Sequence, residues 1–500
     1  MLKTAFKSLK LLKNIKILTN ENSDDLIQEK AKRTIAQLFL SEKGILQKIG
    51  QNFDLDIDFD HELNENDFLK LAIGRNDIEA ILKDNFPQFY DEIELTDDIF
   101  LGSIAQVVKA RYKNREIALK IKFPNIDQKI KEQLQLLNLG SFLGNLINKK
   151  FEMEMRTLVQ DIGAKLSLEL DFKREAQTIK EFKKLSVSRT VKTPSIVEEL
   201  SNENIIAMEW INGESIEQFE NLTNKQLSKA IGAIFENYLL NLFQDGLIQG
   251  DNHPSNYLLG DEIFLIDFGH TIRPKPEFRK ALYLLIRSVI RKENINYLEA
   301  YSYLGFDRGK LKNIEPYLKM ITLTLFEPFT HYGAYSLKNW DVNKKIDFIL
   351  GDLKWWFRSS GSSETFQFLR SLYGILNVIE QSDTKLCYME HFFNSTNSFT
   401  PWLESLKLSP PNSNSEDHKL SETIVIQVLE DKKVKARVSL PINCLYELES
   451  YISESTLKEI EKNKINLNEV IKEAFSNSLK PGQLFYFKDD KNKEYDISLK

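Results

Sequence analysis

Residues 246–269 hold three side chains suited to magnesium-dependent phosphoryl chemistry. Asp251 is followed five positions later by Asn256, and Asp267 opens the tripeptide Asp-Phe-Gly. Carboxylate and amide oxygens are the hard ligands that Mg²⁺ prefers, so Asn256 and Asp267 are candidate metal ligands. The remaining carboxylate, Asp251, could orient or deprotonate an attacking hydroxyl or water. The pattern therefore predicts a site that transfers or hydrolyses a phosphoryl group with the help of a metal.

The flanking sequence predicts how these side chains are positioned. Apolar runs at 257–259 and 262–266 flank Gly260-Asp261, a pair typical of a tight hairpin, which would deliver Asp267 at a strand end. The spacing also fits the kinase motifs D-x-x-x-x-N and D-F-G. D-F-G alone would be a chance tripeptide in a turn, whereas both motifs in this order indicate a kinase-type site.

A lysine on a strand is the next requirement of such a site. Residues 100–112 and 115–122 alternate as strands do, and Ala118, Lys120 and Lys122 share one face of the second run. The small residue at 118 leaves room for adenine, and a lysine on that face can reach the phosphates. Spacing alone leaves Lys120 and Lys122 as rivals, and the charged outer face of a hairpin is the alternative for either.

A carboxylate from a helix must hold that lysine. Within a helix expected over 151–185, Asp171 and Glu175 share a face while Glu169 points elsewhere. Glu175 is the candidate partner, and an exposed acidic face paired with neighbouring basic residues is an equal alternative.

Two other segments are candidates for nucleotide contacts. The turn containing Gly102 and Ser103 precedes the first strand and has one glycine, which is a weak signal for a phosphate-covering loop. Two strands are expected over 196–210, and they close with Met208, Glu209 and Trp210. In a kinase this segment is the hinge whose backbone meets adenine, and an ordinary loop is the alternative.

Composition limits the class of protein. A 500-residue chain with 42% hydrophobic residues is globular, and its net charge of -6 argues against nucleic acid as a partner. No run is long enough to span a bilayer and no signal peptide is evident, which predicts a cytoplasmic protein or one peripheral to a membrane. Residues 1–19 carry five lysines and no acid around helically spaced apolar residues. We favour a packing helix, and the alternative is peripheral membrane contact through this segment.

The pieces together resemble the UbiB (AarF-type, ADCK) family of atypical kinase-like proteins over about residues 30–400. The matching segments, in family order, are Lys48-Ile-Gly-Gln51 for K-x-G-Q, Leu101 to Val107 for the nucleotide loop and S-I-A-Q-V, Ile117 to Lys120 for V-A-V-K, Glu169 to Asp171 for E-x-D, and Gln249 to Asn256 for H-A-D-P-H-P-G-N. Gln249 stands where the family has histidine, Asn252 where it has proline, and Ser255 where it has glycine.

This resemblance implies roles for the residues that spacing left open. Lys120 rather than Lys122 aligns with the phosphate lysine, and Glu175 falls at the position of its partner. Lys48, Gln51, Glu169 and Asp171 would gate the nucleotide site, where the K-x-G-Q helix blocks protein substrates. The family's role implies ATP and Mg²⁺ as cofactors, a lipid or quinone-related small molecule as partner, and support of quinone biosynthesis or lipid homeostasis.

The expected fold is α+β: a bilobal protein-kinase-like fold with an N-terminal helical extension and a small C-terminal α+β domain. The expected boundaries are 1–95 for the extension, 96–215 for the N-lobe, 216–404 for the helical C-lobe, 405–420 for a linker and 421–500 for the C-terminal domain. The first functional hypothesis is an ATPase or small-molecule phosphotransferase. The second is a pseudokinase that acts as a nucleotide-dependent regulatory module.

Overall fold

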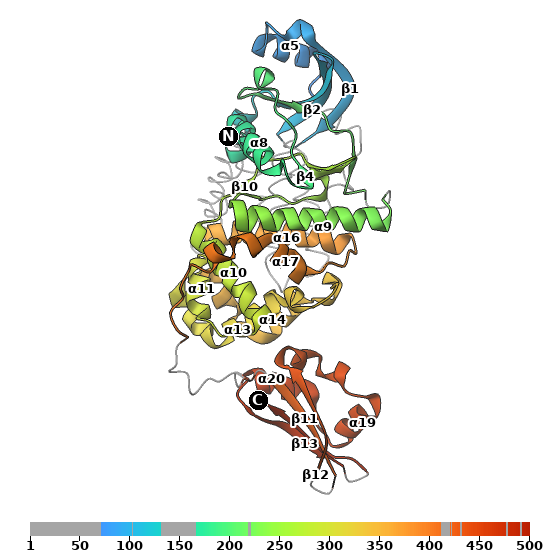
Figure 1. Cartoon of the computed structure of the whole chain (residues 1–500), viewed down its shortest axis with the longest axis vertical. Coiled ribbons are helices and arrows are strands. Elements are labelled where there is room, and N and C mark those ends of the chain that lie inside the picture. The colour runs from blue at the N-terminus through green and yellow to red at the C-terminus, as the bar shows by residue number, and fades with distance from the viewer. Residues whose placement is uncertain are drawn as a thin grey trace, which may run out of the picture. The chain divides into compact units, whose positions relative to one another are not determined.

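The computed structural model describes residues 72–102, 104–131, 167–218, 222–411, 421, 423–430, 433–476, 479–490 and 493–500. The chain divides into two compact units, Met1–Glu217 with Ser255–His270, and Gln218–Pro254 with Thr271–Lys500. The segment that carries Asn256 and Asp267 therefore groups with the first unit, as does the strand that carries Lys120. Figure 1 labels the elements along the chain.

An antiparallel sheet in the order β1-β2-β3-β5 forms much of the first unit. Its strands are β1 (Ile93–Leu101), β2 (Ala105–Tyr112), β3 (Arg115–Lys122) and β5 (Ile205–Glu209). The prediction of a strand over 115–122 is confirmed. The strand expected over 100–112 is instead divided between β1 and β2, because the chain turns at Gly102, whose N–H donates to the carbonyl of Ala105 at 2.8 Å.

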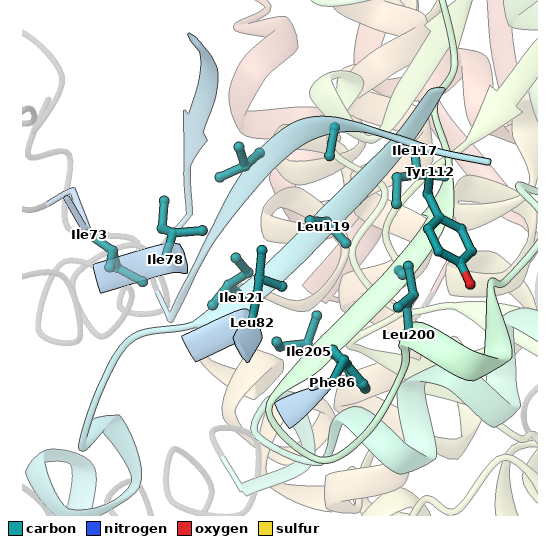
Figure 2. Packing of buried hydrophobic residues seen from close by; sticks show 13 residues of the cluster. Ile73, Ile78, Leu82, Phe86, Tyr112, Ile117, Leu119, Ile121, Leu200 and Ile205 are labelled. Atoms are coloured by element: carbon teal, nitrogen blue, oxygen red, sulfur yellow. The ribbon is translucent and has the colours of Figure 1, made fainter. Parts of the chain in front are cut away.

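Helix α5 (Arg75–Asn85) packs against one face of this sheet. Alternate strand residues such as Leu119 and Ile121 are fully buried beneath Ile78 and Leu82 of the helix. Figure 2 shows these side chains packed together, with Leu82 beside Ile121. Because one face of β3 is committed to this core, the opposite face, which carries Ala118 and Lys120, is left for other contacts.

A second four-stranded sheet of the first unit carries the Asp-Phe-Gly segment, in the order β4-β9-β8-β6. Its strands are β4 (Val191–Lys192), β9 (Ile263–Leu265), β8 (Tyr257–Leu259) and β6 (Glu214–Ser215). Strands β8 and β9 form the expected hairpin, with Leu259 opposite Ile263. The prediction that a hairpin delivers Asp267 at the end of a strand is confirmed.

Two predictions of secondary structure in this unit are wrong. The helix expected over 151–185 is interrupted at Leu170 and Asp171, and α8 begins afresh as Phe172–Ser186. Only one strand, β5, forms within 196–210, because a 3₁₀ turn (Glu198–Leu200) occupies the segment where the first strand was expected. Of that segment only Ile196 makes a bridge, to Met208 of β5.

The second unit is mainly helical between residues 224 and 404. Helix α9 (Asn224–Leu240) buries Ile231 and Tyr238, and a π-helical turn (Asn241–Asp245) extends it. The short strands β7 (Ile248–Gln249) and β10 (Thr271–Ile272) pair with each other. The later helices are α10 (Pro276–Arg291), α11 (Tyr297–Tyr303), α12 (Arg308–Leu311), α13 (Leu318–Leu325), α14 (Val342–Leu350), α15 (Lys354–Ser360), α16 (Ser363–Gln381), α17 (Tyr388–Thr396) and α18 (Thr400–Leu403).

The C-terminal segment has the mixed content expected from its sequence. Its sheet has the order β12-β11-β14-β13, with all neighbours antiparallel. The elements are β11 (Thr423–Glu430), β12 (Lys433–Pro441), α19 (Glu454–Lys462), α20 (Leu467–Ser476), β13 (Gly482–Lys488) and β14 (Glu494–Leu499). A 3₁₀ segment (Ile442–Tyr451) precedes α19.

Within the ranges that the structure describes, no helix is both long and apolar enough to cross a membrane.

Candidate functional site

Lys120 lies at the centre of the candidate site. Its ammonium nitrogen is 2.6 Å from Oε1 of Glu175 and 3.5 Å from Oδ1 of Asp267. Lys120 comes from β3, Glu175 from the first turn of α8 and Asp267 from the segment after β9. Three elements distant in sequence therefore bring together one cation and two carboxylates.

The rival lysine has different neighbours. Nζ of Lys122 is 3.9 Å from Oδ1 of Asp127 and lies over the ring of Phe172 at 5.1 Å. Only Lys120 of the two is paired with Glu175 and Asp267, so the geometry distinguishes positions that share a face of the strand.

Burial and charge act in opposite directions on the pKa of Lys120. Burial lowers the pKa of the ammonium, but the carboxylates of Glu175, Asp267 and Glu169 outweigh it and raise the pKa above its ordinary value. Burial raises the pKa of the Glu175 carboxyl, and the ammonium of Lys120 opposes that increase. A cation with this many nearby carboxylates stays protonated at neutral pH.

The start of α8 positions Glu175. Oδ1 of Asp171 accepts a hydrogen bond of 3.0 Å from the N–H of Arg174, which caps the helix. Phe182, two turns further along α8, packs its ring against that of Phe268, with centroids 5.1 Å apart. The cap and this aromatic contact together fix the helix against the Asp-Phe-Gly segment.

The two candidate metal ligands lie at the open end of one hairpin. The carbonyl of Asn256 accepts from the N–H of Ile266 at 3.0 Å, which continues the β8 and β9 pairing to the residue before Asp267. Oδ1 of Asp267 accepts from the N–H of Gly269 at 3.1 Å, which holds the carboxylate in a local turn. The side chain of Asp267 is 39% exposed, so a ligand can reach it.

Glu169 belongs to the same cluster. A Cβ atom built on Gly269 would lie 3.5 Å from Oδ1 of Asp267, 3.8 Å from Oε2 of Glu175 and 3.9 Å from Cγ of Glu169. Three acidic side chains therefore surround Gly269, and Glu169 and Glu175 are buried.

Asp251 belongs to the second unit, in the loop after β7. Its neighbours in this loop are tied to α16. The amide of Asn252 donates to the carbonyl of Ser371 at 3.0 Å and to the carbonyl of Gln249 at 3.2 Å, and Oγ of Ser371 also donates to the carbonyl of Gln249. Gln249 and Asn252, two positions where this chain departs from the family motif, thus join one buried polar network. The hydroxyl of Tyr238 also belongs to this network.

The candidate adenine contacts lie on the sheet face opposite the α5 core. Ala118 and Met208 are cross-strand partners and both are buried. The N–H of Glu209 donates to the carbonyl of Ser195 at 2.8 Å, and the N–H of Trp210 donates to that of Glu116 at 3.2 Å. Neither N–H can donate to a base without losing its present bond.

Not every predicted residue has a described position. Gly102 lies in the turn between β1 and β2, whereas Ser103, Lys48 and Gln51 lie outside the described residues. The sequence did not single out Phe100, whose ring contacts Trp210 on the same face as Lys120. The pairing of β1 with β2 and of β2 with β3 places Phe100 and Lys120 on one side of the sheet, and this strand order is not readable from the sequence.

The side chains present fit Mg²⁺ and a polyphosphate in their chemistry. Asp267 and Asn256 offer oxygen ligands, and Lys120 supplies a fixed positive charge beside them. Within the described ranges, no group of three or more His, Cys, Asp or Glu residues forms a metal site by itself. A metal here would thus take part of its coordination from Asn256 and from phosphate oxygens, as is usual for Mg²⁺ in nucleotide sites.

The strand lysine paired with a helix glutamate, followed by Asp-Phe-Gly, defines a kinase-like protein. Residues 71–301 match the model of the ABC1 atypical kinase-like domain, which confirms the resemblance to the UbiB/AarF-type family. The relatives include an uncharacterised protein of the hydrogenase 1 5′ region of Clostridium pasteurianum, 29% identical over 50% of this chain and 49% of that protein.

Two relatives carry names that describe them as kinases. The chloroplastic protein ACTIVITY OF BC1 COMPLEX KINASE 1 of Arabidopsis thaliana is 28% identical over 45% of this chain and 37% of that protein. The mitochondrial atypical kinase COQ8B of Rattus norvegicus is 24% identical over 66% of this chain and 65% of that protein. The similarity spans less than two thirds of the length of each relative.

Proposed function

We propose that this protein binds Mg-ATP and acts as an atypical kinase-like ATPase or small-molecule phosphotransferase. The observation that supports it most is the contact of Lys120 with both Glu175 and Asp267. A polyphosphate needs a fixed cation beside its metal, and this arrangement provides the cation and a metal ligand within one unit.

Each candidate residue has a distinct task in this proposal. Lys120 binds the α- and β-phosphates, and Glu175 holds its ammonium in place. Asn256 and Asp267 bind Mg²⁺, which when bound neutralises charge on the phosphates. Asp251 positions a water or an acceptor hydroxyl. Glu169, Asp171, Lys48 and Gln51 gate the site.

The wider layout belongs to the same proposal. We infer a bilobal protein-kinase-like arrangement with the N-terminal extension and the C-terminal α+β domain as additions. By analogy with the family, the acceptor is a small molecule related to quinones or lipids, and the protein is cytoplasmic or peripheral to a membrane. The relatives named as mitochondrial and chloroplastic kinases are compatible with this inference.

One variant tests the catalytic part of the proposal. Asp267→Asn keeps the acceptor for the N–H of Gly269 but removes the negative charge that Mg²⁺ requires. We expect Mg-dependent ATP hydrolysis to fall by roughly 100-fold or more, the loss typical when a charged group that stabilises a transition state is removed. Asp261→Asn, in the exposed turn of the same hairpin, is the matched control and should retain full activity.

Equal hydrolysis by wild type and Asp267→Asn would refute the enzyme assignment. Stabilisation of wild type by Mg-ATP in a thermal melt, without turnover, would favour the second candidate function, a pseudokinase regulatory module. The observation that favours this candidate is Gln249, which is buried in place of the family histidine and whose Oε1 accepts from the N–H of Gly250. Its side chain thus makes a hydrogen bond within the loop.

A further inference from the structure

An aromatic pair spans the face of the sheet that carries Ala118 and Lys120. The ring centroids of Phe100 and Trp210 are 5.9 Å apart, with 43° between the planes. Phe100 lies on β1 and Trp210 directly follows β5, and these are the two outer strands of the sheet. Neighbouring strands are about 4.8 Å apart, so three spacings separate the backbones by roughly 14 Å. The two side chains therefore reach toward each other over the sheet face.

The strand register places this pair over Ala118. Phe100 is opposite Val107, which is opposite Lys120, so Phe100 lies in the row of the lysine. The N–H of Trp210 donates to the carbonyl of Glu116, which lies four residues before Lys120 on β3 and on the same face. The row between them contains Ala118, the small residue expected to leave room for adenine.

The indole of Trp210 is fixed on one side by polar contacts. Its Nε1 donates to Oδ1 of Asn212 at 3.0 Å, and the amide of Asn212 donates to Oε2 of Glu116 at 3.3 Å. Nζ of Lys109 is 2.8 Å from Oε1 of Glu116 and 5.1 Å from the centre of the indole ring. Since the Trp210 ring is already oriented, stacking a planar ligand on it costs little conformational entropy of this side chain.

Phe100 differs from Trp210 in exposure. Its side chain is 55% exposed at the end of β1, next to the turn that contains Gly102. One ring of the pair is therefore fixed and the other is free to move outward. A flat ring inserted between them needs a separation of about 7 Å, twice the contact distance between carbon atoms, and outward movement of Phe100 supplies it.

Two backbone donors at the expected hinge are already used, which favours stacking as a means of holding a base here. The N–H groups of Glu209 and Trp210, at the expected hinge, already donate to Ser195 and Glu116. Stacking on aromatic rings is a substantial source of base affinity in other nucleotide-binding sites.

We propose that Phe100 and Trp210 form a clamp that receives the purine base between their rings. This inference rests on the proposed function, because it assumes that a nucleotide places its phosphates at Lys120. The larger ring system of a purine covers more of both aromatic faces than a pyrimidine does. The clamp thus selects purine over pyrimidine nucleotides.

The test compares the dissociation constants of Mg-ATP and Mg-CTP for the full-length chain, measured by isothermal titration. Wild type should favour ATP. Phe100→Leu and Trp210→Leu should each weaken ATP binding by roughly 5- to 150-fold, the range for losing one stacked ring. CTP binding should change less. The ratio of the CTP dissociation constant to the ATP dissociation constant (the CTP to ATP ratio) therefore falls toward one. A variant that merely damages the fold would weaken both nucleotides alike and leave the ratio unchanged.

Trp210→Phe and two exposed aromatic residues outside the site serve as matched controls. Trp210→Phe keeps a ring and should retain most of the preference, while Phe366→Leu and Trp356→Leu should bind as wild type does. ATP should also quench tryptophan emission in wild type and not in Trp210→Phe.

An unchanged CTP to ATP ratio in both leucine variants, with ATP still bound by wild type, would overturn the clamp alone. Failure of wild type to bind Mg-ATP at all would overturn the proposed function and the clamp with it.

Discussion

Lys120 is a buried cation whose charge depends on the carboxylates around it. Removing its ammonium would leave Glu175, which is 1% exposed, without its ion-pair partner. Leaving one buried charge unpaired typically costs about 3–5 kcal/mol, unless the group takes up a proton. The structure therefore links the stability of the site to pH through one carboxyl group.

The variant Lys120→Met should lose stability increasingly as the pH rises. Burial raises the pKa of Glu175 above its ordinary value of 4.5, and without Lys120 nothing as close opposes this increase. The folded variant then binds a proton that the unfolded chain releases above about pH 4.5, so unfolding becomes easier toward neutral pH. In wild type, folding raises the pKa of Lys120, so this group also stabilises the fold more at lower pH. The stability that it contributes is fully present below pH 10.5 and is lost only at higher pH.

Urea unfolding at pH 5, 6, 7 and 8 measures this effect. The gap between wild type and Lys120→Met should widen across the series and approach about 3–5 kcal/mol near neutral pH. The double variant Lys120→Met/Glu175→Gln, which has no carboxyl at position 175, should not show this widening with pH. A gap that does not change with pH in the single variant would contradict the account of the ion pair.

At the scale of elements, the site depends on how α8 begins. Asp171 caps the helix that presents Glu175, and the chain breaks at Leu170 so that Glu169 approaches Gly269 from outside the helix. The two acids of the Glu169-Leu-Asp171 motif therefore have different structural tasks. One is buried in the acidic cluster and the other stabilises a helix end.

Asp171→Ala should lower the free energy of unfolding by about 0.5–2 kcal/mol, because the N–H of Arg174 loses its acceptor. Asp171→Asn retains an acceptor oxygen without the charge and should stay within about 0.5 kcal/mol of wild type. Chemical denaturation of the three proteins separates capping from charge. Equal destabilisation by alanine and asparagine would show that the carboxylate charge, not the cap, is what matters at this position.

Local sequence patterns predicted the elements whose contacts are local. The alternation in 115–122 and the Gly260-Asp261 turn gave β3 and the hairpin because strand alternation and turn chemistry are properties of a few adjacent residues. The break before α8 was not predicted, since helical spacing continues through Leu170 and the competing bond is a side-chain cap.

Contacts between distant elements were predictable only where chemistry demanded them. A strand lysine needs a carboxylate, which pointed to Glu175, 55 residues away. The choice between Lys120 and Lys122 could not follow from alternation, because both lie on one face. The contact of Phe100 with Trp210 joins the two edges of a sheet whose strand order the sequence does not state.

At the scale of the whole molecule, the candidate phosphate and metal residues gather in one compact unit. Lys120, Glu175, Asn256 and Asp267 all belong to it, while Asp251 belongs to the helical unit. Nucleotide binding is thus a property that the first unit should dominate. Mg-ATP affinity is accordingly a more direct test of the account than activity is.

The decisive measurement is the affinity of the full-length chain for Mg-ATP in wild type, Lys120→Met and Lys122→Met. The two variants make the same chemical change two residues apart on one strand face, so they share any general effect of losing a lysine. The contacts of Lys120 with Glu175 and Asp267 predict that Lys120→Met weakens binding by roughly 10-fold or more, the loss of about 1.4 kcal/mol of charge interaction, while Lys122→Met binds within about twofold of wild type. Equal affinities for all three proteins, or a larger loss in Lys122→Met, would contradict the central claim that Lys120 is the phosphate-binding cation of this site.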